Sequence, residues 1–195
     1  MDTARIEKLV GQLDLLRRRQ MELEGDDPGD ASEYLVFPGA AEAEIAAAEA
    51  ANGMRYPDCY RRFLALHNGW RGFWPDWHLM GVPREDNKDM YTDLKMNLDL
   101  LPKVVGPQTL AELPERERHD DRRILLTNHP ILGLDLNGSF LVFDRYRNGP
   151  TGDPVVAWVH FLQHVERRWS SFEYLFLAAI EDTESEITDL TQSQT

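Results

Sequence analysis

The sequence predicts an α+β fold, in which helices come first, a meander of antiparallel strands follows, and one more helix closes the chain. Helix-forming segments fill the first third of the 195 residues, and apolar runs of β character cluster in the last third. An Asn137-Gly138 pair separates two of these runs and is typical of a tight β-hairpin. Because helices and strands are segregated rather than alternating, α+β is favoured over a parallel α/β sheet.

The first helix is expected over residues 3–23, where apolar residues recur at three- and four-residue spacing. Three consecutive arginines, Arg17 to Arg19, crowd its later turns, where cations complement the helix dipole. A solvated helix end is favoured for these arginines over a binding patch. The glycine-, proline- and aspartate-rich stretch at residues 25–30 then predicts a loop.

Two further helices are expected before the strands. The first covers residues 40–51, is dense in alanine and glutamate, and ends at Asn52-Gly53. The second begins at Pro57, which suits the first turn of a helix, and runs to His67. Asn68-Gly69 then offers the left-handed conformation that closes helices. Residues 83–106 give no clear pattern, and the charged residues 112–123 are interpreted as a loop or a short helix.

The strands are expected in apolar runs at residues 124–127, 131–136, 139–144 and 155–159. The closing helix follows, and Ser170 with Glu173 has the spacing of a capping box at its start. From residue 181 onwards the chain is polar and acidic, with five acidic residues and no basic residue, which predicts a frayed tail.

Composition limits the function classes. A chain of 195 residues with 42% hydrophobic residues suits one well-buried core, and no window is long and apolar enough for a membrane-spanning helix. The first ten residues lack the apolar region of a secretory signal. Cys59 is the single cysteine and cannot form an internal disulfide, so a reducing cytoplasm is the expected location.

The charge balance says more about partners. The chain has 34 acidic and 21 basic side chains, a formal net charge of −13. Such a surface repels nucleic acid and anionic membranes and attracts basic proteins. Composition alone favours solubility as the role of this charge, and attraction of a cationic partner is the alternative.

Four short motifs in one order resemble the SUKH superfamily of Smi/Knr-type proteins. The resemblance covers residues 40–180 and includes a proline-started helix, a tryptophan-bearing strand with a glycine, a hairpin ending in aspartate, and a closing helix with an SFE start. The residues that match are Tyr56-Pro57, Tyr60, Phe63-Leu64 and Asn68-Gly69, then Trp77 to Gly81, Ile131 to Asp144, and Ser171-Phe172-Glu173-Tyr174-Leu175.

The resemblance implies a strongly curved central sheet covered by the N-terminal helices, and it implies a binding protein rather than an enzyme. Bacterial members are mostly immunity proteins that bind a toxin domain and block its active site. Many such toxins are nucleases with basic clefts, so the resemblance favours attraction of a basic toxin as the role of the acidic surface. Fungal relatives are regulatory scaffolds, and a scaffold with an endogenous partner is the alternative. The expected division is an N-terminal helical extension at 1–24, an acidic loop at 25–39, a SUKH-like α+β domain at 40–181 and an acidic tail at 182–195.

Motifs for catalysis were sought and not found. His160 and His164 have the spacing of a zinc-binding helix but lack the glutamate that serves as base. No glycine-rich phosphate loop occurs, and no nucleophile signature surrounds Cys59. We therefore expect no catalytic residues, cofactor or metal, no nucleic-acid or membrane partner, and leave the oligomeric state open.

The candidate site is a partner-binding surface made of tryptophans and the acidic residues that flank them. Tryptophan is enriched at the centres of protein interfaces, and carboxylates complement a basic toxin. The alternatives are that the tryptophans join the helices to the sheet and that the acids belong to a solvated loop. The predicted partner-binding residues are Trp74, Asp76, Trp77, Glu85, Asp86, Asp89 and Asp93.

Overall fold

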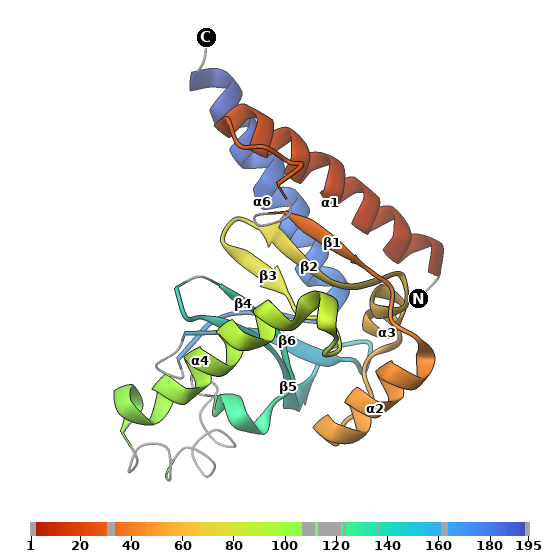
Figure 1. Ribbon diagram of the computed structural model, residues 1–195, viewed down its shortest axis with the longest axis vertical. Coiled ribbons are helices and arrows are strands. Elements are labelled where there is room, and N and C mark those ends of the chain that lie inside the picture. Colours follow the sequence, from red (N-terminus) through yellow and green to blue (C-terminus); the bar gives the residue numbers. More distant parts are fainter. Residues whose placement is uncertain are drawn as a thin grey trace.

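The computed structural model describes residues 3–30, 34–106, 112, 122, 124–135, 137–160 and 164–193. Its centre is an open, seven-stranded antiparallel sheet whose strands lie side by side in chain order (Figure 1). Irregular register interrupts several of the pairings, and such bulges bend the strands. The strands are β1 (Leu35–Pro38), β2 (His67–Trp74), β3 (Trp77–Leu79), β4 (Ile131–Asp135), β5 (Phe140–Asn148), β6 (Pro154–Val159) and β7 (Val165–Trp169).

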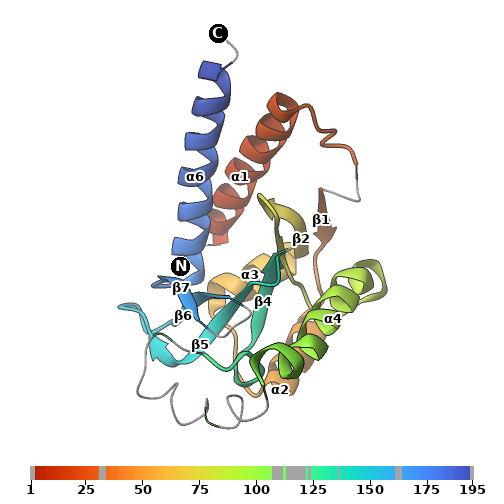
Figure 2. The same ribbon diagram turned by 90° about the vertical axis from the view of Figure 1, so that its left-hand side faces the viewer.

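Helices cover both faces of this sheet (Figure 2), so the predicted α+β class is confirmed. The described part of the chain contains no helix with the length and apolar character needed to cross a membrane. The helices are α1 (Thr3–Glu24), α2 (Glu42–Asn52), α3 (Asp58–Leu66), α4 (Lys88–Val105) and α6 (Phe172–Ser193), with short 3₁₀ turns η1 (Glu85–Asn87) and η2 (Leu126–Asn128).

The sheet separates two hydrophobic clusters, because successive side chains of a strand point to opposite faces. On β5, Leu141 and Phe143 join the cluster under α1, α3 and α6. Phe140 and Val142, from the same strand, join the cluster under α4. The first cluster is rich in aromatic rings, as where Phe172 of α6 packs 4.9 Å from Tyr60 of α3 between ring centroids.

The helices α1 and α6 run in parallel, and their far ends project beyond the sheet (Figures 1 and 2). The residue numbers of their contacts increase together along both helices. Gln12 donates to Glu184 at 3.4 Å, and Gln20 donates to Glu186 at 2.7 Å. The apolar side of α1 is buried in the core cluster that it shares with α6, and Leu13 is fully buried there. The predicted first helix is therefore confirmed, and it packs on the core cluster.

The expected frayed tail is wrong, because α6 continues to Ser193. Thr183, Ile187 and Leu190 extend the apolar spacing of the helix, and Thr183 is fully buried. The cap also differs by one residue. The backbone N–H of Tyr174 lies 3.4 Å from the hydroxyl oxygen of Ser171, so Ser171 rather than Ser170 caps the helix.

The expected helix stop at Asn68-Gly69 is also wrong. Helix α3 ends at Leu66, and both residues belong to strand β2. The side chain of Asn68 accepts a bond from the Val82 N–H at 2.7 Å and donates to the Val82 carbonyl at 2.9 Å. Gly69 has φ +104°, and a side chain there would lie 2.8 Å from the Gly81 nitrogen. The pair thus ties β2 to the segment after β3.

Among the other expected elements, one hairpin and one strand are confirmed, whereas one loop and one strand are corrected. The Asn137-Gly138 hairpin lies between β4 and β5, and the predicted strand at 155–159 is β6. The expected loop at 25–39 contains the short strand β1, and the run at 124–127 leads into η2 instead of forming a strand. Most of residues 112–123 lies outside the described part of the chain.

Candidate partner-binding site

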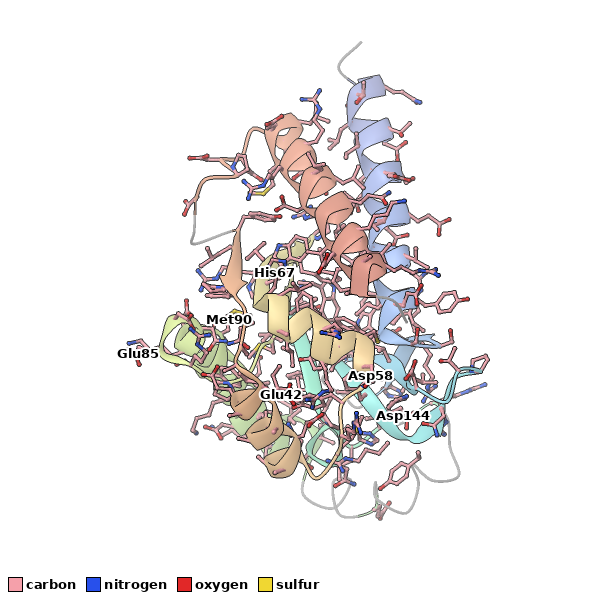
Figure 3. All side chains as sticks on the ribbon, turned by 90° about the vertical axis from the view of Figure 1, so that its right-hand side faces the viewer. Glu42, Asp58, His67, Glu85, Met90 and Asp144 are labelled. Atoms are coloured by element: carbon pink, nitrogen blue, oxygen red, sulfur yellow. The ribbon has the colours of Figure 1, made fainter. Side chains whose placement is uncertain are left out.

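Four of the predicted acids gather on η1 and the start of α4. Glu85 lies at the outer edge of the molecule there (Figure 3), and its side chain is 85% exposed. A local hydrogen bond stabilises the η1 turn that carries Glu85, because the side chain of Asn87 accepts a bond from the Arg84 N–H at 2.9 Å. The exposed members of this η1–α4 acidic surface are Glu85, Asp86, Asp89 and Asp93.

Most of the η1–α4 acidic surface is neutralised within the chain. Glu85 pairs with Lys88, and Asp86 lies 3.1 Å from the guanidinium of Arg84. Asp89 pairs with Arg71, which projects from β2. Within the described residues, Asp93 is the member with no ion pair closer than 4.0 Å. The surface therefore offers less uncompensated negative charge than its sequence indicates.

Asp76 is separated from the other acids by its place in the fold. It lies on the turn between β2 and β3 and has φ +62°, in the left-handed region. Its charge raises the pKa of the buried Arg17 in α1, although burial of Arg17 lowers that pKa overall. The structure thus divides the predicted site between this turn and the η1–α4 acidic surface.

The tryptophans predicted to face a partner are buried. Trp74 is 8% exposed and Trp77 is 7% exposed. Trp74 makes an edge contact with Trp169 at 6.1 Å between ring centroids, and Trp77 makes one with Trp158 at 5.3 Å. This burial corrects the expectation of an exposed aromatic anchor and supports the alternative, that these tryptophans join elements of the core.

His78 lies on strand β3, and one nitrogen of its ring is already hydrogen-bonded within the fold. Its Nδ1 accepts a hydrogen bond from the Gly72 N–H at 3.1 Å across the β2–β3 hairpin. Burial lowers the pKa of His78 below its usual range, and the charge of Arg71 adds to this effect, against the opposing charges of Asp93 and Asp89. The ring is therefore a neutral hydrogen-bond acceptor in the hairpin.

Cys59, His160 and His164 are the residues with catalytic or metal-binding side chains that the sequence singles out. Burial raises the pKa of the Cys59 thiol to about 12, so the reactive thiolate is not formed near neutral pH. His160 directly follows β6 and His164 directly precedes β7, and the His160 N–H donates to the His164 carbonyl at 2.8 Å. Within the described residues, no group of His, Cys, Asp and Glu side chains has an arrangement that could hold a metal ion.

The three arginines of α1 are neither a binding patch nor simply a solvated end. Arg17 is 6% exposed and donates to the Gly72 carbonyl at 3.1 Å, which ties α1 to β2. Arg18 pairs with Asp14 and lies over the Tyr34 ring, 5.0 Å from its centroid. Arg18 and the outer Arg19, which pairs with Glu22, are both exposed and match the expected solvated position, whereas Arg17 does not.

A groove at the projecting ends of α1 and α6 was missed from the sequence, because residues after 181 were interpreted as a tail. The helical spacing of four residues indicates that the helix continues past residue 181: these are Ile180, Thr183, Ile187 and Leu190. The groove has a volume of about 450 Å³. Its lining residues are Gln20, Glu24, Pro75, Glu186, Asp189, Leu190 and Ser193.

These features define an α+β protein whose described surface presents acidic patches and a groove. A family model described as the SMI1 / KNR4 family (SUKH-1) matches residues 39–178, and the chain belongs to this family. The family is known broadly for toxin-immunity-like domains, and its members are generally non-enzymatic. No curated protein matches the chain.

Proposed function

We propose that this protein is a non-enzymatic immunity protein that binds a cognate toxin domain and neutralises it. The observation that carries the proposal is the family match, which spans the core of the fold from residue 39 to residue 178. Binding would be stoichiometric, and inhibition would follow from covering the active site of the toxin. The proposed setting is the cytoplasm, where the toxin and this protein would meet.

The net charge of −13 supports a basic toxin as the partner. Complementary charge steers two proteins together and raises association rates to about 10⁸–10⁹ M⁻¹s⁻¹ at low salt. A nuclease is the class of toxin that fits best, because its substrate cleft is basic to hold nucleic acid. Fast capture matters most for a toxin present in the same compartment.

The first experiment is a rescue assay with the toxin candidate encoded beside this chain. The C-terminal domain of the protein encoded immediately upstream is expressed in a sensitive bacterium with and without the chain. We expect toxicity without the chain, rescue with it, and a one-to-one complex on co-purification. Persistent toxicity without a complex would rule out this pairing, and a harmless neighbour would favour the regulatory scaffold.

The η1–α4 acidic surface is proposed as a steering surface for the toxin. Reversing Glu85, Asp86 and Asp93 to lysine is the sharpest test, because Asp89 holds Arg71 and is left in place. We expect slower association with the toxin domain and an unchanged thermal midpoint. An association rate equal to that of the unmodified chain would remove this surface from the proposal.

A further inference from the structure

The parallel course of α1 and α6 brings two helix C-termini to the same end of the molecule (Figure 2). A helix C-terminus carries a partial negative charge that cations near it compensate. Neither helix has a basic residue in its last turn. The negative ends of the two helix dipoles and the acidic side chains both contribute negative potential at this end of the described structure.

The carboxylates of the groove lack a cation at contact distance. The side-chain amide of Gln20 donates to Glu24 at 3.0 Å and to Glu186 at 2.7 Å, so a neutral group joins the two acids. Within the described residues, no lysine or arginine lies within 4.0 Å of Glu24, Glu186 or Asp189. Arg17 interacts with the first two at longer range, but its side chain is buried and bonded to Gly72 and Gln20.

Glu186 is the partly buried acid of the groove. Burial raises the pKa of Glu186, and the nearby charges of Glu24 and Asp182 act in the same direction. The hydrogen bond from Gln20 and the charge of Arg17 oppose this shift without cancelling it. A cation that entered the groove would therefore relieve the repulsion that Arg17 and Gln20 compensate only in part.

The groove also has apolar walls. Pro75, on the turn that carries Asp76, and Leu190, on the last turns of α6, both line it. An apolar wall below a carboxylate rim matches the lysine and arginine side chains, which bury an aliphatic stem and keep a charged head among polar groups. This combination distinguishes the groove from the η1–α4 acidic surface, whose acids mostly have their own cations.

We propose that the groove between the ends of α1 and α6 receives a lysine or arginine side chain from a basic segment of a protein partner. The stem lies between Pro75 and Leu190, and the charged head faces Glu24, Glu186 and Asp189. Taking this partner to be the toxin domain rests on the function proposed above. The groove is then the anchoring point of the complex, while the η1–α4 acidic surface contributes to steering.

The test titrates the ¹⁵N-labelled full chain with the peptide acetyl-Gly-Leu-Lys-Arg-Gly-amide, followed by NMR. The control peptide has glutamine in place of both basic residues. We expect shift changes at Gln20, at Glu24, at Asp76 and along residues 186–193 with the basic peptide, and none there with the control. Changes centred on η1 and α4, or spread evenly over the acidic surface, would overturn the proposal.

Two matched triple variants distinguish the effect of the groove acids from the effect of the net charge. The groove variant carries Glu24→Gln, Glu186→Gln and Asp189→Asn, and the control variant carries Glu7→Gln, Glu166→Gln and Asp58→Asn. Both lose three negative charges of the same residue types at exposed or partly exposed positions. We expect the groove variant to weaken peptide binding at least about tenfold and the control variant to change it less than about twofold. Equal effects of the two variants would contradict the inference.

The same two variants are then tested against the toxin domain. If the unmodified chain binds the toxin and the groove variant binds equally well, the groove inference fails while the proposed function stands. If no toxin pairs with the chain but the peptide binds the groove in the expected pattern, the proposed function fails while the groove keeps its role as a site for basic segments.

Discussion

Asp144 shows how much one buried charge contributes in this fold. Its side chain is fully buried at the point where β5 leaves the core. One carboxylate oxygen accepts the Tyr146 N–H at 3.0 Å, as expected for an aspartate that anchors a turn. The other lies 3.0 Å from Arg147 and 3.6 Å from Arg168.

Replacing Asp144 with asparagine is expected to destabilise the protein by about 3 kcal/mol. Asparagine keeps an oxygen for the Tyr146 N–H, but it leaves two arginines without their buried counter-charge. Urea denaturation measures the free energy of unfolding. Glu85→Gln serves as the control, because the exposed pair with Lys88 contributes less than about 1 kcal/mol. A loss below about 1 kcal/mol for Asp144→Asn would show that the pairing is not a significant source of stability.

His78 predicts a pH dependence of stability. Its pKa is lowered in the folded state, mainly by burial, whereas the unfolded chain takes up a proton near 6.5. The unfolded state therefore binds more protons as the pH falls below about 6.5, and the folded state loses stability. Each unit by which the pKa is lowered corresponds to about 1.4 kcal/mol.

The measurement compares the unmodified chain with His78→Gln at about pH 7.5 and about pH 5.5. Glutamine can accept the bond from the Gly72 N–H and does not titrate, so the stability advantage of histidine should shrink at the lower pH. His67, whose pKa is also lowered by burial, is present in both proteins and does not affect the difference. Parallel losses of stability in the two proteins would contradict the assignment to His78.

At the level of elements, α1 separates what local sequence can predict from what it cannot. The apolar spacing placed this helix correctly, and Leu13 on its apolar face is fully buried. That this face packs against α6 was not predictable, because the polar and acidic composition after residue 181 does not indicate a helix. Pairings such as Gln20 with Glu186 join residues 166 positions apart.

Leu13 and Leu15 provide a matched pair for testing whether α1 belongs to the core. Leu13 is fully buried, whereas Leu15 is 72% exposed on the same helix. Leu13→Ala is expected to cost about 3 kcal/mol, because it removes buried methyl groups and leaves a cavity. Leu15→Ala should change the free energy of unfolding by less than about 0.5 kcal/mol. If both substitutions are neutral, α1 is a separable extension, as its sequence position first indicated.

The strands show the same division between local and distant signals. The β4–β5 hairpin was predicted because an Asn-Gly turn and apolar flanks agree with each other. Strand β2 was missed because its Asn68-Gly69 pair is also typical of a helix end, and β7 was missed because Glu166, Arg167 and Arg168 give it little apolar pattern. For the candidate site, the sequence identified the acids, but their division between η1–α4 and the β2–β3 turn and the ion pair of Asp89 with Arg71 required the fold.

At the scale of the whole molecule, negative charge is distributed unevenly. Three of the four acids of the η1–α4 acidic surface are paired with cations of the chain, whereas the acids around the groove have none at contact distance among the described residues. Net charge alone could not reveal this difference. It arises because α1 and α6 run in parallel and end together, and neither helix has a basic residue in its last turn.

This distribution predicts how association with the toxin domain depends on salt. Raising the ionic strength from about 0.01 M to about 1 M shortens the screening length from about 30 Å to about 3 Å, so steering by the net charge of −13 should be lost. Stopped-flow measurements should show an association rate that falls at least about tenfold, while dissociation changes much less because salt screens long-range steering more than close contacts. The control variant should keep most of this salt dependence, and the groove variant should also dissociate faster. An association rate that does not respond to salt would mean that the charge serves solubility, and recognition would then rest on apolar contacts alone.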